Sequence, residues 1–248
     1  ARRGQARVGL PGQGYSPAAA QGWGIGDNGF ETDGAEDSVW QPVPTATIYN
    51  CTVIGQPLDG DHATAWRDNA RVQYRNCIFM DLGERLVSFD NVDGDGGSGY
   101  GFNGTLNWPT TWTTAYNAVP AHANDFTTGT YATNYASQTS GKLAEITDSV
   151  FFRNLNGSAY TEATAQGVFN AGNNNVLISG SDEEDAPIVA LVRGPQVTPF
   201  GTLDMLPVIG LDPRPRNQAL TSVGSAPSDG FFTPASSRGA CAPAPTAA

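Results

Sequence analysis

Short runs of alternating apolar and polar residues recur along the chain. Residues 45–54 and 71–80 are rich in β-branched and aromatic side chains and are bounded by Gly, Asp and Pro. Runs of this length and composition are typical of β-strands. The same pattern predicts further strands at residues 143–152, 167–170, 175–179 and 188–193.

Two of these runs begin with the same Asn-Cys pair. The step from Cys51 to Cys77 is 26 residues, and a degenerate third copy begins at Asp148. Short acidic turns at residues 30–34, 66–69 and 88–91 recur along the same part of the chain. A unit this short cannot bury its apolar face alone, so it must stack on neighbouring copies. The repeat predicts an all-β solenoid, a parallel β-helix.

One long segment interrupts the repeat. Residues 92–142 open with Asp and Gly and are then rich in Thr, Asn, Tyr and Trp. A structureless segment of this length is uncommon in a compact domain, so we expect a folded insertion or a functional loop. We predict one β-helix domain at 25–210, after a lead-in at 1–24 that is irregular or is the worn end of an earlier coil. Residues 211–248 should form a C-terminal cap and a disordered tail.

The charge of the chain limits its partners. A net charge of −11 and an isoelectric point near 4.4 argue against binding nucleic acid or an anionic membrane surface. No apolar run approaches the roughly 20 residues that cross a bilayer. The sequence starts at Ala1 without an initiator Met or a signal h-region, so we expect a processed or fragmentary product of an exported protein.

Three cysteines are present, at positions 51, 77 and 241. They form no C-x-x-C or Cys/His cluster, so the sequence gives no support for a zinc or redox centre. If Cys51 and Cys77 take equivalent inward positions on adjacent coils, the strand spacing of about 4.8 Å suits a disulfide. They are either bridged or are two reduced residues of a buried ladder. Cys241 lies in a Pro/Ala-rich tail and is expected to be unpaired or joined to another chain.

Several segments resemble a known family. They are GDNGFETD at 26–33, PTATIYN at 44–50, LDPRP at 211–215 and DGFF at 229–232. They are similar to secreted bacterial proteins with a right-handed parallel β-helix (pectin-lyase-like), which are largely uncharacterised and often described as lipoproteins or hypothetical proteins. The resemblance covers about residues 22–90 and 143–235 and excludes the insertion. It implies a fold and a secreted, cell-surface or periplasmic location, but little about activity, because β-helices host lyases, hydrolases, adhesins and structural proteins.

A polysaccharide lyase or glycoside hydrolase is the enzymatic alternative. Such enzymes need carboxylates clustered with a base or with supporting cations. Arg67 and Asp68 are the candidate residues, but the chain's lysine and its two histidines, His62 and His122, lie near no paired carboxylates. We expect Arg67 and Asp68 to form a polar corner instead.

The acidic turns are candidate metal ligands. If they are in register, Asp33, Asp68 and Asp90 stack one per coil, where the like charges repel unless a cation lies between them. Ca²⁺ takes about six to eight oxygens and would suit Glu31, Asp33 and Asp68 with corner carbonyls. The alternative is a series of aspartate turns that face water.

The aromatic residues of the insertion give the second lead to function. They are Trp108, Trp112 and Tyr116, at four-residue intervals, with Tyr131 and Tyr135. These rings could stack on sugars, dock on a partner subunit or form the insertion's own core. The sequence as a whole favours a non-catalytic β-helix scaffold that binds extracellular glycan or serves as an accessory subunit of a larger assembly.

Overall fold

The structure is a computed structural model of residues 1–248. It describes residues 8–9, 28–34, 45–68, 70–89, 108–115, 141–155, 168, 171–198, 201, 203–220, 224, 226–228 and 232–244. The described part is largely strand, with one short helix, α1 (Trp108–Thr111), and short 3-10 turns. The prediction of an all-β fold is confirmed.

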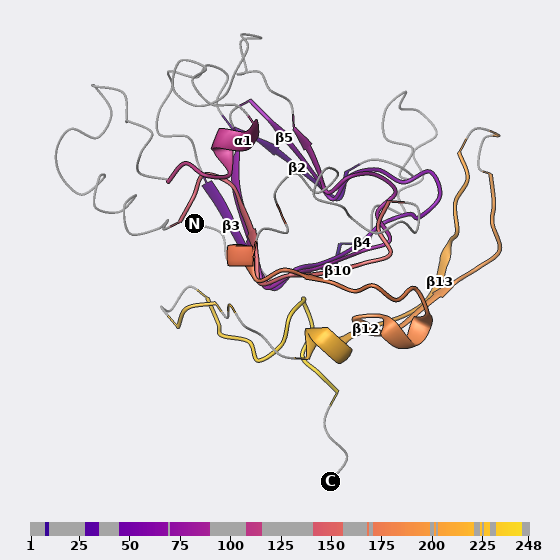
Figure 1. Cartoon of the computed structure of the whole chain (residues 1–248). Coiled ribbons are helices and arrows are strands. Elements are labelled where there is room, and N and C mark those ends of the chain that lie inside the picture. The colour runs from indigo at the N-terminus through magenta and orange to yellow at the C-terminus, as the bar shows by residue number, and fades with distance from the viewer. Residues whose placement is uncertain are drawn as a thin grey trace, which may run out of the picture.

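Three parallel sheets, which the chain visits in turn, form the body of the molecule (Figure 1). Sheet one consists of β2 (Phe30–Asp33), β5 (Thr64–Arg67) and β8 (Val87–Phe89). Sheet two consists of β3 (Thr45–Tyr49), β6 (Arg71–Arg75) and β9 (Glu145–Thr147). Sheet three consists of β1 (Val8–Gly9), β4 (Thr52–Ile54), β7 (Ile78–Met80), β10 (Val150–Phe152) and β11 (Val176–Leu177). We call one passage through the three sheets a coil. A single apolar core lies inside the sheets, and residues such as Trp66, Tyr74 and Phe79 are fully buried there.

The strand register reproduces the sequence repeat. Thr52 pairs with Ile78, 26 residues further on, and Val150 pairs with Val176 at the same step. Between these pairs, Ile78 lies opposite Val150, a step of 72 residues. The insertion therefore adds chain between β8 and β9 and leaves the register of the coils on either side unchanged.

A left-handed residue turns the chain into sheet three on each coil. These residues are Asn50, Asn76, Asp148 and Asn174, with φ angles of 54°, 60°, 55° and 53°. Asn and Asp tolerate this conformation better than other residues that carry a side chain. The Asn-Cys pairs of the sequence thus mark a corner that recurs on each coil.

The residue after each corner satisfies a backbone group of the preceding coil. The hydroxyl of Ser149 accepts a hydrogen bond from the backbone N–H of Cys77 at 3.0 Å, and the amide oxygen of Asn175 accepts one from the N–H of Ser149 at 2.9 Å. These N–H groups are turned inward, where an unpaired donor would be costly.

Both faces of sheet three are covered. Phe79 and Phe151 stack inside, with ring centroids 5.3 Å apart, while Ile78 and Phe152 belong to a second apolar cluster on the outside. That cluster is completed by a hairpin of β12 (Ile188–Arg193) and β13 (Val208–Pro215). Strands β4, β7 and β10 are therefore apolar without strict alternation, as parallel strands covered on both faces usually are.

The strand pairing bears on both ends of the predicted β-helix domain. We predicted that residues 188–193 would be part of that domain, but β12 pairs antiparallel with β13. Among the described residues, the parallel strands end with β11. At the other end, β1 pairs with β4 and extends sheet three into residues 1–24, in agreement with the alternative that they are the worn end of an earlier coil.

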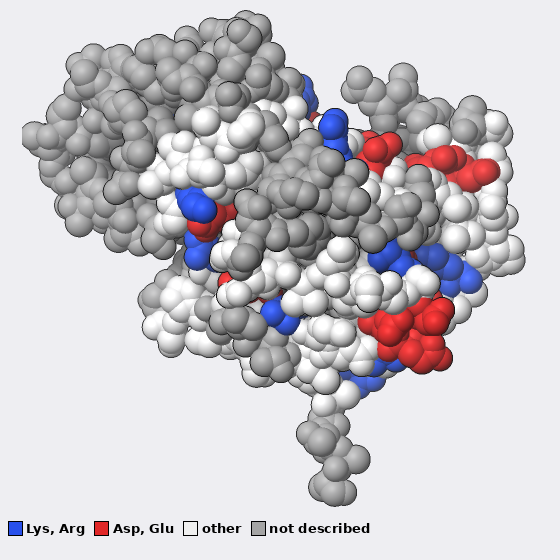
Figure 2. All heavy atoms as spheres, in the orientation of Figure 1, with Lys and Arg blue, Asp and Glu red and all other residues white. Residues whose placement is uncertain are grey.

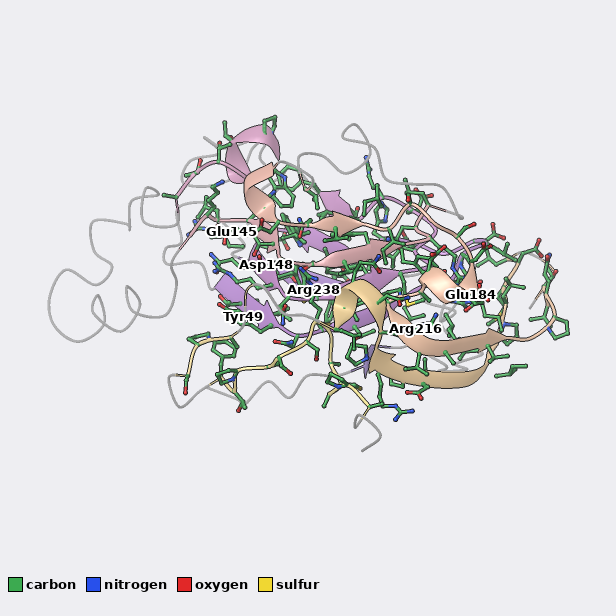
Figure 3. All side chains as sticks on the ribbon, turned by 60° about the horizontal axis from the view of Figure 1, so that its bottom comes forward. Tyr49, Glu145, Asp148, Glu184, Arg216 and Arg238 are labelled. Carbon is green, nitrogen blue, oxygen red and sulfur yellow. The ribbon has the colours of Figure 1, made fainter. Side chains whose placement is uncertain are left out.

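Residues 232–244, within the predicted C-terminal cap and tail, lie against the corners of the coils. The side-chain amides of Asn50 and Asn76 donate to the carbonyl of Ser237 at 2.7 and 2.9 Å. The neighbouring Arg238 donates to the carbonyl of Asp148 at 2.6 Å (Figure 3). Gly239 has φ = 81°, and a Cβ there would lie 2.6 Å from the side chain of Ile78. The corner amides thus give this Pro-rich segment hydrogen-bond partners.

Candidate functional site

Arg67 ends β5, and Asp68 follows it. A guanidinium nitrogen of Arg67 lies 2.7 Å from a carboxylate oxygen of Glu31, and both side chains are about half exposed. The hydrogen bond that Arg67 donates to Glu31 and the charge of Asp33 raise the pKa of Arg67. A guanidinium held in its protonated form is a poor base. Asp68 takes a left-handed corner position, with φ = 51°.

The predicted column of aspartates is not in register. Asp33 lies opposite Arg67, so Asp68 comes one residue later, past the end of β5. Asp90 lies outside the described residues. Among the residues that the structure describes, no group of three or more His, Cys, Asp or Glu is placed to hold a metal ion, and calcium binding stays a prediction.

Trp112 lies in the inner core. It is 8% exposed, and its ring centroid lies 5.2 Å from that of Trp66. Its burial argues against the predicted recognition role. The core it joins is that of the parallel sheets rather than the insertion's own core, which was the predicted alternative. Only the backbone of Trp108 is described, in α1. Tyr116, Tyr131 and Tyr135 lie outside the described residues.

The two inner cysteines are free thiols on adjacent coils. The sulfur of Cys77 accepts a hydrogen bond from the backbone N–H of Cys51 at 3.4 Å and donates one to the carbonyl of Arg75 at 3.3 Å. Burial raises the pKa of Cys77 to about 12, and it raises that of Cys51 as well. Neutral, buried thiols are weak nucleophiles, so both cysteines act in the fold.

His62 lies in a surface loop beside Asp61, which its ring contacts, and Arg85 donates to its other ring nitrogen at 3.4 Å. Both ring nitrogens of His62 thus have partners within the chain. His122 lies outside the described residues.

A buried ion cluster joins the coils to the hairpin. The carboxylate of Asp81, 2% exposed, lies 3.0 Å from Arg153 of the next coil and 2.8 Å from Arg193 of β12. Arg193 also donates to the carbonyls of Gly55 and Leu206, at 2.8 and 3.0 Å. The hydrogen-bonding groups of this cluster are used within the chain. The cluster fixes the position of the hairpin on sheet three.

A groove of about 450 Å³ lies beside this cluster and follows β12. It is lined by residues 189–193, by Glu183 and Glu184 of the 3-10 helix η4 (Glu183–Asp185), and by Arg216. Figure 2 shows the acidic side chains gathered over η4, with basic side chains beside them. Arg216 donates to the carbonyls of Glu183 and Ala186. Glu184 is exposed and also lines a second hollow of about 430 Å³ (Figure 3).

Two exposed large hydrophobic side chains, Val192 and Ile209, lie on the strands of the hairpin and are 50% and 67% exposed. Two more among the described residues, Val197 and Leu220, lie in the loop between the strands and after β13. A Cβ at Gly210 would lie 3.3 Å from Val192, and one at Gly194 would lie 3.1 Å from Ile209. Two glycines therefore flank the exposed side chains and flatten this face. The sequence signal was the apolar run at 188–192, within a segment that we predicted as a strand.

No family model matches the sequence, and comparison with curated proteins and with solved structures found no match. None of the helices that the structure describes is long and apolar enough to span a membrane.

Proposed function

We propose that the chain is a right-handed parallel β-helix that acts as a non-catalytic scaffold, an accessory subunit of a larger extracellular or periplasmic assembly. The β-helix is supported by the three parallel sheets, their shared core and the 26-residue register. The location follows from the resemblance of the sequence to secreted β-helix proteins.

The exposed face of the hairpin carries the proposal of a protein partner. Val192 and Ile209 are 50% and 67% exposed on a strand pair whose other face is packed on sheet three. A flat apolar surface beside charged groups is typical of a protein interface, with an apolar centre and a polar rim. We name the surface formed by Val192, Ile209 and Gly210 the hairpin face.

The other predicted functions have less support among the described residues. Glycan binding has less support because Trp112, one of its candidate residues, lies in the core. A lyase or hydrolase site has less support because Arg67, its candidate base, is half exposed and paired with Glu31. The partner that the described surface fits best is therefore another protein subunit.

The test compares variants of the chain in its native host. Ile209→Lys places a charge in the hairpin face, and Ser179→Lys makes the same kind of change at an exposed position outside the hairpin. After chemical cross-linking in the host, the parent and Ser179→Lys should give the same heterologous adduct, and Ile209→Lys should lose it with an unchanged melting temperature. An adduct that persists in Ile209→Lys, or no adduct with the parent, would overturn the proposal.

A further inference from the structure

Among the described residues, no strand pairs with the edge of β12 that faces away from β13. In an antiparallel pair, alternate residues turn their backbone N–H and C=O groups toward the partner strand, and the others turn theirs away. Within the part of the chain that the structure describes, β12 pairs with β13 alone. The groove follows β12 over five consecutive residues, 189–193. This is the arrangement expected of a groove along a strand edge.

The two strands of the hairpin differ in how their edges are protected. β13 contains Pro213 and Pro215, and its Asp212 and Arg214 side chains form an exposed ion pair. Proline and charge are the usual means by which an edge strand avoids pairing with another chain. β12 has the sequence IVALVR, which contains no proline. Its one charged residue is the last, Arg193, whose guanidinium is bound to Asp81. One edge of the hairpin is thus blocked and the other remains able to pair.

The charges around the groove indicate what would pair there. The guanidiniums of Arg193 and Arg216 are already bonded within the chain, to Asp81 and to the carbonyls of Glu183 and Ala186. The carboxylate of Glu184 faces both hollows and is exposed. A segment that carries lysine or arginine would therefore complement the groove, and an acidic segment would be repelled.

We propose that the open edge of β12 binds an extended, basic segment of the partner subunit as an added strand. This inference rests on the proposed function and names the chemistry of the partner. Backbone hydrogen bonds to β12 supply the affinity, as in other cases of strand addition, and Glu184 selects for positive charge. Val192, which lines the groove and is half exposed, gives the added strand apolar contact.

The test uses the full chain and three synthetic octapeptides: alternating lysine and valine, the same peptide N-methylated on alternate backbone amides, and alternating glutamate and valine. The first should bind and slow amide hydrogen exchange in residues 188–193. The other two should bind at least about tenfold more weakly, because each lacks either the backbone donors or the complementary charge. Glu184→Lys should weaken the lysine peptide by a similar factor, and the matched reversal Asp33→Lys, on an exposed position of β2, should not.

Equal binding of the N-methylated peptide, protection that spares β12, or no binding of the lysine peptide would each overturn this inference. Its failure is distinguishable from failure of the proposed function. If the peptide does not pair but Ile209→Lys still loses the cross-linked partner, the hairpin face is an interface without strand addition. If the peptide pairs but the cross-linked adduct is unaffected by Ile209→Lys, the hairpin face is not the interface.

Discussion

The backbone N–H of Cys51 donates a hydrogen bond to the sulfur of Cys77, 3.4 Å away on the next coil. In the same way, the hydroxyl of Ser149 accepts a hydrogen bond from the backbone N–H of Cys77. Each of these side chains also donates to the backbone carbonyl two residues before it: Ser149 to Thr147, and Cys77 to Arg75. The cysteines are thus two members of a column of inward acceptors. Their chemistry as thiols is incidental to this role.

Replacing Cys77 should separate hydrogen bonding from packing. Cys77→Ser keeps an acceptor and a donor in the geometry of Ser149 and should change the free energy of unfolding little. Cys77→Val has a similar volume but leaves the N–H of Cys51 without an acceptor, which should cost about 1–3 kcal/mol. Urea denaturation of both variants measures the difference. Equal stability of the two would contradict the role of Cys77 as an acceptor.

Alkaline pH should destabilise the protein before it disturbs the surface ion pairs. Burial raises the pKa of Cys77 to about 12 and also raises those of Cys51 and Tyr74. A group whose pKa is higher in the folded state contributes its full stability to that state at any pH below its unfolded pKa, which is about 8.5 for cysteine. This contribution is lost as the pH rises from about 8.5 toward 12. Urea denaturation at pH 7.5 and pH 10.5 should show the decline, and Cys77→Ser should reduce it. A flat profile would contradict the assignment.

Removing the charge of Asp81 should loosen the hairpin. Asp81→Asn leaves Arg193 without its buried carboxylate, and breaking a buried ion pair from one side typically costs about 3–5 kcal/mol. Asp212→Asn is the matched control, because its ion pair with Arg214 is on the surface and should contribute little to stability. Thermal melting compares the two, and hydrogen exchange at residues 188–193 should rise only in Asp81→Asn. Similar small effects would show that the cluster does not hold the hairpin.

Trp112 should behave as a core residue. Trp112→Ala removes a buried ring that packs on Trp66, and such changes cost about 3–5 kcal/mol. Trp112→Phe keeps much of the aromatic contact and should cost less. Both variants are compared by urea denaturation. An unchanged stability in Trp112→Ala, with loss of binding to a partner, would restore the recognition role that the sequence suggested.

The sequence determined the repeat of the parallel body. Alternating runs at 45–54 and 71–80 predicted strands, and the 26-residue step between the Asn-Cys pairs is the observed register. The degenerate copy at Asp148 returned to that register after the insertion. These features were readable because they are local. Strand-forming residues, and an Asn or Asp in the left-handed conformation, determine the backbone conformation of their own segment. Both features recur from coil to coil.

Tertiary structure decided which elements meet. The run at 188–193 looks like any buried strand, and only its packing on the outer face of sheet three, with Asp81 holding Arg193, makes it half of an antiparallel hairpin. Asp33 faces Arg67 rather than Asp68 because the register of sheet one is set by the whole strand pair. Trp112 is buried because its ring packs against Trp66, which is distant in sequence. Exposure and pairing depend on contacts between distant segments, and residue type along the chain does not specify them.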